Sequence, residues 1–374
     1  MKYLFYLAHP AHFHLFKPTI RALKEKGHEV LVTSKSKDVL QDLLASSGFN
    51  YVNISARERK ATRTGMLKAL LKRTWQHLKI CIDYRPHIFI STSAEFAPFC
   101  RLLGIKAISI FEDDLSLFPM YSRILVPFLH HQLCPESCFA AHWEHHPKTI
   151  KYRGNQELAY LRPDRFIPDE KAAMSVLDPC RPNFLIRFSG LTAWHDENAR
   201  GISDTLARQI IALLEPRGRI LISSERPLPG ALETYRVRIR PEDLLHVLYF
   251  ADLYIGDSQT MTAEAAVLGT PAVRFNDFVG KIGYLEELEK KYGLAHGIPA
   301  GRPDLLIKTL TELLEQKDLK ADAAEKRKLL LENSIDPTLL FVWFLENYPH
   351  SARELTLKPD LQLQFKSKWP VTSR

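Results

Sequence analysis

A segment around residue 258 has the composition of an anion site at the start of a helix. Residues 251–273 read ADLYIGDSQTMTAEAAVLGTPAV, in which a predicted strand leads directly into a helix of small residues. Ser258 suits the position that caps this helix. The first backbone N–H groups after it, those of Gln259, Thr260 and Met261, are expected to lack acceptors within the helix. Such groups favour a bound diphosphate.

Glu264 lies one turn into the same helix, on the face that carries Thr260. Met261 stands three residues before Glu264, so this acid cannot complete a capping box with a serine or threonine. Its carboxylate is therefore expected to accept hydrogen bonds from hydroxyl groups, and a ribose diol is the expected partner. The alternative is that Ser258 only caps the helix and that Glu264 is a solvated acid favoured by the helix dipole.

The loop after the first apolar run contains three histidines in the sequence HPAHFH. Histidine exchanges protons near neutral pH, because its reference pKa is about 6.5. We therefore expect His9 or His12 to act as a general base, ahead of His14. The alternative is that the three imidazoles cap the next helix and pack against aromatic neighbours.

Three consecutive acids, Glu112, Asp113 and Asp114, follow the apolar run ISIF. Like charges at adjacent positions raise one another's pKa, which suits proton transfer. Glu112 and Asp113 are the catalytic candidates. Binding of a divalent ion and capping of the next helix beside Lys or Arg are the alternatives.

Polar residues also follow the first two strands of the second half of the chain. Arg187 and Arg200 each offer a planar guanidinium fork that matches phosphate oxygens, with pairing to nearby surface acids as the alternative. His195 lies in the same loop. Ser224 and Glu225 end the next strand and are expected to contact the base or the ribose of a nucleotide.

Strands and helices alternate along the chain in the pattern of parallel sheets covered by helices. We predict domains at 1–165 and 166–345 and a C-terminal tail at 346–374, which is loosely attached beyond Lys358. One helix is predicted at 18–26, with a proline in its first turn, and an apolar helix at 339–348. The predicted strands cover residues 2–8, 29–33, 51–54, 88–91, 108–111, 184–188, 220–223, 235–239, 253–255 and 272–275.

The charge of the chain is concentrated in its first part. The 374 residues carry a net charge of +8, with 45% hydrophobic and 25% charged residues, which is typical of a globular protein. Residues 1–165 hold 24 Lys and Arg against 14 Asp and Glu, whereas the rest holds 27 against 29. The basic part is expected to meet an anionic lipid surface or a phosphorylated substrate. No zinc finger, helix-turn-helix or base-stacking signature accompanies it, so nucleic acid is not an expected partner.

The sequence predicts a cytoplasmic protein without a metal or a cofactor. No apolar run approaches the roughly 18 residues of a membrane-spanning helix, and no signal-peptide cleavage pattern is found. The five cysteines are sparse and odd in number, as in a reducing compartment. Cys134 and Cys138 lie near several histidines, but their spacing matches no zinc site.

Residues 57–79 mix eight Lys and Arg with Met, Leu and Trp. A basic amphipathic helix of this kind can lie on anionic lipid, which would make the protein peripheral at the inner membrane face. The alternative is a helix that faces the core and has a solvated basic side.

Several motifs together resemble an uncharacterised GT-B-like family, the domain of unknown function three-five-four. The motifs, in chain order, are HPAHFHLF at 9–16, RGNQELAYL at 153–161, RFSGLTAWHDENARG at 187–201, SSERPLP at 223–229 and GDSQTMTAEAAVLGTP at 256–271. The last one is also similar to the donor-nucleotide motif of UDP-N-acetylglucosamine 2-epimerases and MurG-type N-acetylglucosaminyltransferases. In those enzymes a serine begins the helix and a glutamate binds ribose, which are the positions of Ser258 and Glu264 here. Asn155 is similar to a hinge residue of the epimerases and is interpreted as structural.

This resemblance implies a GT-B fold, an α/β architecture with two Rossmann-like doubly wound domains facing a central cleft. It implies a glycosyltransferase-like enzyme that moves a sugar from a nucleotide diphosphate sugar, a UDP-hexosamine, to a cell-surface glycan or lipid-linked acceptor. A 2-epimerase-like isomerase, with Glu112 and Asp113 as its acids and bases, is one alternative. That alternative departs from the epimerase pattern, because HPAH stands in place of the GTRPE-like first loop. A non-catalytic nucleotide-sugar-binding protein is the second alternative.

Overall fold

The chain folds into two compact units, each built around its own sheet. The structure is a computed structural model that describes residues 1–35, 39–54, 63–190 and 201–366. Unit 1 comprises Met1–Tyr160 together with Ser334–Arg374, and unit 2 comprises Leu161–Asn333. The predicted division at residue 165 lies close to the first boundary. The predicted second boundary at 345 is wrong, because the chain returns to unit 1 at Ser334.

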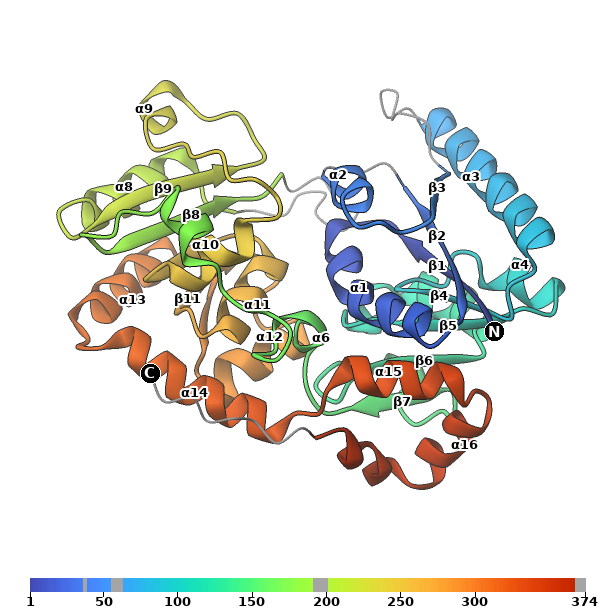
Figure 1. The fold of residues 1–374 in the computed structure, drawn as a ribbon. Helices are drawn as coiled ribbons and strands as arrows, with labels where there is room; N and C mark the ends of the chain where they lie inside the picture. Colours follow the sequence, from blue (N-terminus) through green and yellow to red (C-terminus); the bar gives the residue numbers. More distant parts are fainter. Residues whose placement is uncertain (36–38, 55–62, 191–200, 367–374) are drawn as a thin grey trace. The chain divides into compact units, whose positions relative to one another are not determined.

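Unit 1 contains a seven-stranded sheet in which every neighbouring pair is parallel (Figure 1). Its order, β3-β2-β1-β4-β5-β6-β7, reverses direction at β1, as in doubly wound folds. Phe5 of β1 is in register with Val32 and Ile90 on its two sides. The strands are β1 (Lys2–Leu7), β2 (Glu29–Ser34), β3 (Tyr51–Asn53), β4 (Ile88–Ser91), β5 (Lys106–Ile110), β6 (His131–Pro135) and β7 (Thr149–Tyr152).

Helices cover both faces of this sheet. Alternate residues of a strand point to opposite faces, so Phe5 packs with the helices α1 and α15, whereas Tyr6 packs with His77 of α3. The helical segments of unit 1 are α1 (Pro10–Glu25), α2 (Leu40–Ala45), α3 (Arg63–Tyr84), α4 (Ala97–Leu102), η1 (Leu115–Leu117), α5 (Pro119–Ile124), η2 (Val126–Phe128), η3 (Ala141–Trp143), α15 (Pro337–Glu346), α16 (His350–Leu357) and η6 (Pro359–Phe365). A further short helix, α6 (Leu158–Leu161), lies at the boundary of the two units.

The C-terminal segment is part of the unit 1 core, which corrects the prediction of a loose tail. Leu340, Phe341 and Phe344 of α15 are fully buried in the same cluster as β1. Beyond Lys358 the chain forms η6, where the side-chain oxygen of Gln362 accepts a hydrogen bond from the backbone N–H of Arg153 at 2.8 Å. The tail was mispredicted because its anchoring partners lie about 200 residues earlier in the chain.

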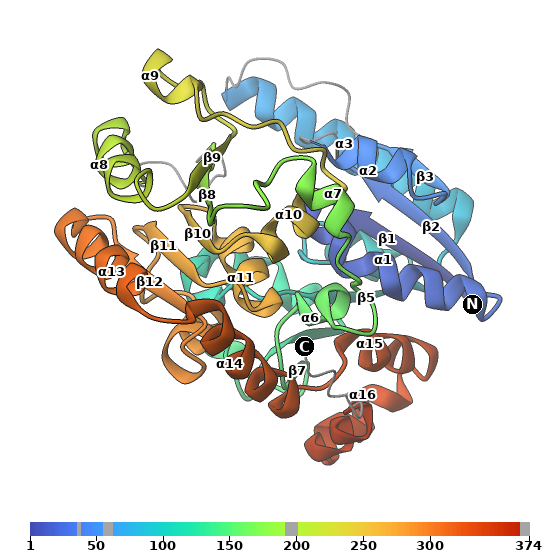
Figure 2. The same ribbon diagram turned by 60° about the vertical axis from the view of Figure 1, so that its left-hand side comes forward.

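Unit 2 contains a five-stranded parallel sheet in the order β12-β11-β10-β8-β9 (Figures 1 and 2). Its strands are β8 (Asn183–Phe188), β9 (Arg219–Ser224), β10 (Leu253–Gly256), β11 (Ala272–Asn276) and β12 (Ala295–Pro299). Its helical segments are α7 (Glu170–Met174), α8 (Asp204–Leu214), α9 (Gly230–Glu233), α10 (Leu244–Phe250), α11 (Gln259–Leu268), α12 (Gly283–Glu286), η5 (Glu287–Lys291), α13 (Pro303–Glu315) and α14 (Leu319–Asn333).

Two predicted elements differ from the structure. Helix α1 begins at Pro10 rather than Pro18, so Pro18 lies inside the helix and not in its first turn. Residues 235–239 form no strand; only an isolated bridge between Ile222 and Arg236 is found there. A short alternation of apolar and basic residues, here YRVRI, fits an irregular segment beside a sheet as well as a strand. The strands β6, β7 and β12 were not predicted.

We expect unit 1 to lose stability in mild acid because it buries a neutral imidazole. Burial against Phe96, at 4.0 Å between ring centroids, lowers the pKa of His77 from 6.5 to about 3. The unfolded chain therefore binds more protons than the folded one below about pH 6.5, and stability falls with pH through that range. A His77→Phe variant should retain on the order of 1 to 2 kcal/mol more of its pH 7 stability at pH 5 than the parent. Urea unfolding at the two pH values measures this, and equal losses in both proteins would contradict it.

Candidate functional site

The start of α11 in unit 2 has the geometry that its sequence predicts. Ser258 adopts an extended backbone conformation, and its hydroxyl accepts a hydrogen bond from the backbone N–H of Met261 at 3.4 Å. The N–H of Met261 is thus used by the cap and is not available to a ligand, contrary to the prediction. The N–H groups of Gln259 and Thr260 have no acceptor within the helix, which is the arrangement that can bind an anion.

Glycine is required where β10 meets this helix. A Cβ atom on Gly256 would lie 2.3 Å from the hydroxyl oxygen of Tyr254, which is closer than atoms can approach. Gly269 ends α11 with a φ of 80°, a left-handed conformation that favours glycine. These two residues hold the helix start at the carboxyl end of the sheet.

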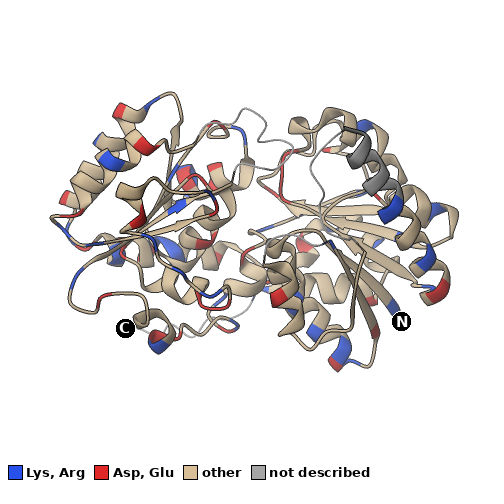
Figure 3. Cartoon of the chain, turned by 90° about the horizontal axis from the view of Figure 1, so that it is seen from above, with Lys and Arg blue, Asp and Glu red and all other residues tan. Residues whose placement is uncertain are grey.

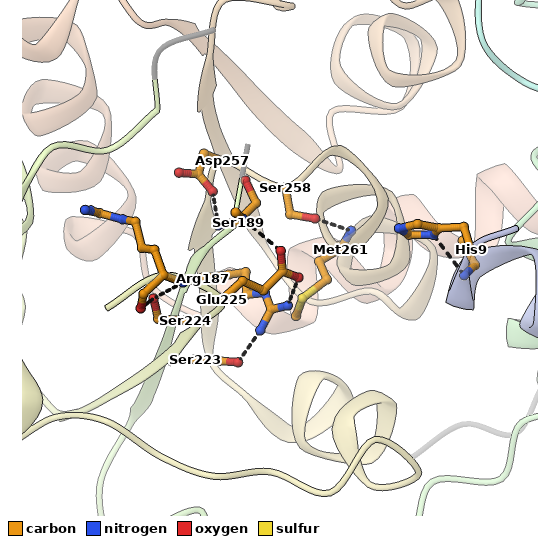
Figure 4. A network of polar contacts seen from close by, with 12 residues as sticks. His9, Arg187, Ser189, Ser223, Ser224, Glu225, Asp257, Ser258 and Met261 are labelled. Atoms are coloured by element: carbon orange, nitrogen blue, oxygen red, sulfur yellow. Dashed lines mark hydrogen bonds and ion pairs between the residues drawn. The ribbon is translucent and has the colours of Figure 1, made fainter. Parts of the chain in front are cut away.

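Arg187 forms a network with the end of the neighbouring strand (Figure 4). It is in register with Gly256 of β10 and with Ser223 of β9. Its guanidinium donates a hydrogen bond to the Ser223 hydroxyl at 2.6 Å and forms an ion pair with Glu225. The second carboxylate oxygen of Glu225 accepts a hydrogen bond from the backbone N–H of Gly190 at 2.8 Å. The carboxylate of Glu225 thus makes the contacts that a phosphate group would make here.

The remaining predicted residues of unit 2 have different surroundings. Glu264 is buried, with 5% of its surface exposed, so it is not a solvated first-turn acid. The hydroxyl of Ser224 donates a hydrogen bond to the carbonyl oxygen of Arg226 at 2.8 Å and serves its own turn. His195 and Arg200 lie outside the residues that the structure describes.

Sequence reasoning missed two polar residues at this sheet edge. Asp257 is buried, and one of its carboxylate oxygens accepts a hydrogen bond from the backbone N–H of Ser189 at 2.7 Å. Burial raises the pKa of Asp257, whereas the hydrogen bonds from Ser189 lower it. Asn276, at the end of β11, donates a hydrogen bond to the carbonyl oxygen of Asp257 at 3.1 Å. Their position directly after two parallel strands is the signal that could have identified them.

In unit 1, the first histidines are fixed at the start of α1. His9 is the cap of this helix, and its Nδ1 accepts a hydrogen bond from the backbone N–H of Ala11 at 3.2 Å. Nδ1 of His12 accepts one from the N–H of Ala8 at 3.2 Å. In a neutral imidazole whose Nδ1 is an acceptor, the proton is on Nε2. With this tautomer Nε2 carries the proton in both rings, and Nε2 of His12 lies 3.0 Å from the hydroxyl oxygen of Thr92, to which it can donate.

His14 is held in a more apolar environment. Its ring packs beside Phe13 and Tyr160. Burial, together with the charge of Lys17, lowers its pKa from 6.5 to about 4. This residue is therefore a neutral packing side chain at physiological pH.

The capping hydrogen bond of His9 at the start of α1 can be tested by replacing this residue. His9→Ala removes the side-chain acceptor and should lower the free energy of unfolding by about 1 kcal/mol. His9→Asn keeps an acceptor at the cap and should change it by only a few tenths of a kcal/mol. Urea denaturation of the two variants measures the difference. Equal destabilisation would show that the imidazole contributes more than its hydrogen bond to Ala11.

The three acids after β5 differ in burial. Asp114 is buried and accepts a hydrogen bond from the backbone N–H of Phe139. Glu112 is half-buried; burial raises the pKa of its neighbours Tyr152 and Cys138, and the charge of Glu112 raises both further. Asp113 is exposed. Asp114 therefore has a structural role, and Glu112 and Asp113 remain as candidates for chemistry.

The buried polar residue Asn155 follows β7 in unit 1. It is fully buried, and neither atom of its side-chain amide has a hydrogen-bond partner in the described part of the chain. The interpretation of Asn155 as a structural residue stays a prediction.

Part of the basic segment 57–79 can also be located. Residues 57–62 lie outside the described ranges, and α3 begins at Arg63. From residue 72 onward, Lys72 and Lys79 are exposed, Trp75 is 63% exposed and His77 is buried. From residue 72 onward the segment thus has one buried side and one basic, solvated side.

The described residues contain no group of three or more His, Cys, Asp or Glu side chains that could hold a metal ion. None of their helices combines the length and the apolar character that crossing a membrane requires.

Comparison with models of known protein families assigns the chain to one of them. A family model described as "Protein of unknown function (DUF354)" matches residues 2–278. The chain belongs to this family. Among curated proteins, none matches the chain at a significant level of sequence similarity.

Solved structures of similar fold include both epimerases and glycosyltransferases. A putative UDP-N-acetylglucosamine 2-epimerase from Listeria monocytogenes has a TM-score of 0.65 at 12% identity, with 99% of this DUF354 chain and 98% of that chain covered. The UDP complex of MnaA from S. aureus has a TM-score of 0.64 at 10% identity, with 99% of both chains covered. The spinosyn rhamnosyltransferase SpnG has a TM-score of 0.62 at 16% identity, with 93% of this chain and 100% of that chain covered. The fold is therefore GT-B, with two Rossmann-like domains.

Proposed function

We propose that this DUF354 protein binds a nucleoside diphosphate sugar, a UDP-hexosamine, and transfers the sugar to a cell-surface glycan or lipid-linked acceptor. The observation that carries this proposal is the site in unit 2. There the N–H groups at the start of α11, which have no acceptor within the helix, follow β10, and Arg187 of the neighbouring strand β8 is in register with the last residue of β10. UDP and UDP-GlcNAc are bound in solved structures of the same fold.

The residues of unit 2 can stabilise the diphosphate that leaves when the sugar is transferred. The N–H groups of Gln259 and Thr260 would hold one phosphate, and the guanidinium of Arg187 would neutralise developing charge. Glu264 would bind the ribose hydroxyl groups. Arginine and the helix start together provide the stabilisation that a divalent ion supplies in other transfer enzymes.

Transfer also requires a base that removes a proton from the acceptor hydroxyl. The sequence favours His9 or His12 for this role, but a neutral ring whose Nδ1 accepts a backbone hydrogen bond is less suited to it. We therefore assign the role to one of the carboxylates after β5, Glu112 or Asp113. The same two carboxylates favour a second candidate, a 2-epimerase-like isomerase, because removing and returning a sugar proton requires an acid and a base.

Calorimetric titration with UDP, GDP, CDP, dTDP and their sugars tests the donor site. We expect UDP-selective binding that Glu264→Ala weakens by about tenfold or more, since two hydroxyl hydrogen bonds to a charged group are lost. Absence of binding by every nucleotide to the folded protein would contradict the proposal. Incubation of the sugar nucleotide alone, followed by NMR, then separates isomerisation, which needs no acceptor, from transfer. Tight binding without either reaction would indicate a non-catalytic binding protein.

A further inference from the structure

A groove of about 550 Å³ lies at the amino-terminal edge of the unit 1 sheet. The starts of β1, β4 and β5 form its floor, and Ile82, Leu103 and Tyr348 are among its walls. The catalytic candidates of unit 1 follow the carboxyl ends of its strands, at the opposite edge of the sheet. The groove is therefore separate from the proposed chemistry.

Large apolar side chains are exposed around this groove. Leu102, the last residue of α4, is 83% exposed, and Ile82 of α3 is 49% exposed. Phe128 of η2, which contacts α4, is 38% exposed. Single exposed apolar residues are common, but several around one apolar groove mark a contact surface.

The rim of the groove is positively charged. Arg85 and Lys106 line it, and Arg101 precedes Leu102. These three cations are exposed, and within the described ranges none of them forms an ion pair. By contrast, other basic residues along the chain are paired with acids, such as Lys26 with Glu346. Figure 3 marks the positions of Lys and Arg in blue and of Asp and Glu in red along the chain.

His130 lies close enough to the cations of the groove rim to be affected by their charge. Nδ1 of His130 accepts a hydrogen bond from the backbone N–H of Ala107, beside the start of β5. Burial and the charges of Lys106, Arg101 and Lys148 lower the pKa of His130 to about 4. The acids near this edge are few: Asp83 is exposed on α3, and Glu29 is paired with Lys2 at 3.3 Å.

We propose that this edge of unit 1 docks on an anionic lipid bilayer. The surface is defined by Ile82, Arg85, Arg101, Leu102, Lys106 and Phe128. The apolar side chains would enter the boundary between headgroups and acyl chains, while the cations meet lipid phosphates. Long basic side chains beside exposed leucines suit this arrangement, since their stems cover apolar surface and their charges reach the headgroups.

Charge argues against the other occupants of the groove. A second copy docked through the same surface would bring like charges together, which opposes association. Nucleic acid would match the charge but would leave the exposed leucines without a partner. The inference stands independently of the nucleotide-sugar proposal, since it concerns residues of unit 1 that the donor site does not use.

Sedimentation with sucrose-loaded vesicles tests the docking of the full chain. We expect binding to equimolar phosphatidylcholine and phosphatidylglycerol that is at least about tenfold tighter than binding to phosphatidylcholine alone. Leu102→Ser and Arg101→Glu should each weaken it about fivefold or more. Ile167→Ser, at a residue of unit 2 with 80% exposure, and Arg208→Glu, at an exposed residue of α8, are matched controls that should leave it unchanged.

Each result supports or overturns the docking surface. All four variants replace exposed side chains, and unchanged thermal unfolding will show that they fold. Failure to bind anionic vesicles would overturn the inference, as would equal binding by Leu102→Ser, Arg101→Glu and the parent. Light scattering without lipid adds a further outcome: a dimer that Leu102→Ser dissociates would identify the groove as a self-interface and also overturn the inference.

Discussion

Replacing Arg187 with glutamine should weaken UDP binding by about 100-fold. The guanidinium is the cation at the carboxyl end of β8, where it contacts Ser223 and Glu225. Loss of charged hydrogen bonds to a phosphate costs about 1.5 to 3 kcal/mol. Titration calorimetry with UDP measures the change. Affinity within about twofold of the parent would show that Arg187 serves only the ion pair.

Replacing Glu225, the ion-pair partner of Arg187, should strengthen UDP binding instead of weakening it. The carboxylate of Glu225 binds both the guanidinium and the N–H of Gly190, so an incoming phosphate must displace it. Glu225→Gln removes the competing charge and should strengthen UDP binding, by up to about tenfold. Glu233→Gln, at a residue paired with Arg236 and similarly exposed, is the control and should have no effect. Weaker binding by Glu225→Gln would instead make this residue a ligand of the nucleotide.

Replacing Arg274 with methionine should lower the free energy of unfolding by about 3–5 kcal/mol, because it leaves the carboxylate of Glu289, whose side chain is 8% exposed, without its cation. Arg274 is fully buried in β11, and its Nε and Nη2 contact Glu289 at 3.0 and 2.7 Å. A second carboxylate, that of Glu286, lies 3.7 Å from Nη2. Urea unfolding at neutral pH measures the loss.

Two further variants test whether the loss of stability comes from the buried ion pair. Arg302→Met breaks the exposed ion pair with Asp304 and should cost less than about 1 kcal/mol. The double variant Arg274→Met with Glu289→Gln should be more stable than Arg274→Met alone, because one uncompensated charge is removed. A single and a double variant of equal stability would contradict a buried ionic contribution.

Local patterns predicted the sheet edges well. Ser258 was predicted to cap α11 because a serine between an apolar run and a helix of small residues satisfies free N–H groups. The parallel sheets followed from the alternation of strands and helices. In each case the information lies within about ten residues of chain, where sequence spacing determines geometry.

Contacts between residues far apart in the sequence explain most of what the sequence did not predict. The ion pair of Arg187 with Glu225 joins two strands, and nothing near Arg187 in sequence indicates it. Pro18 was assigned to the start of a helix because proline suits that position, but Pro10 fits it equally and is the one at the start. The tautomers of His9 and His12 depend on backbone N–H groups whose positions become known only with the fold.

The return of the C-terminal segment to unit 1 has a consequence for the order of folding on the ribosome. The strands of unit 1 are synthesised first, but Leu340, Phe341 and Phe344 complete their core and are made only after all of unit 2. Unit 2 is continuous in sequence and can close as soon as it emerges. Unit 1 is therefore synthesised first but completes its folding last. During synthesis its incomplete core is exposed apolar surface, to which chaperones can bind.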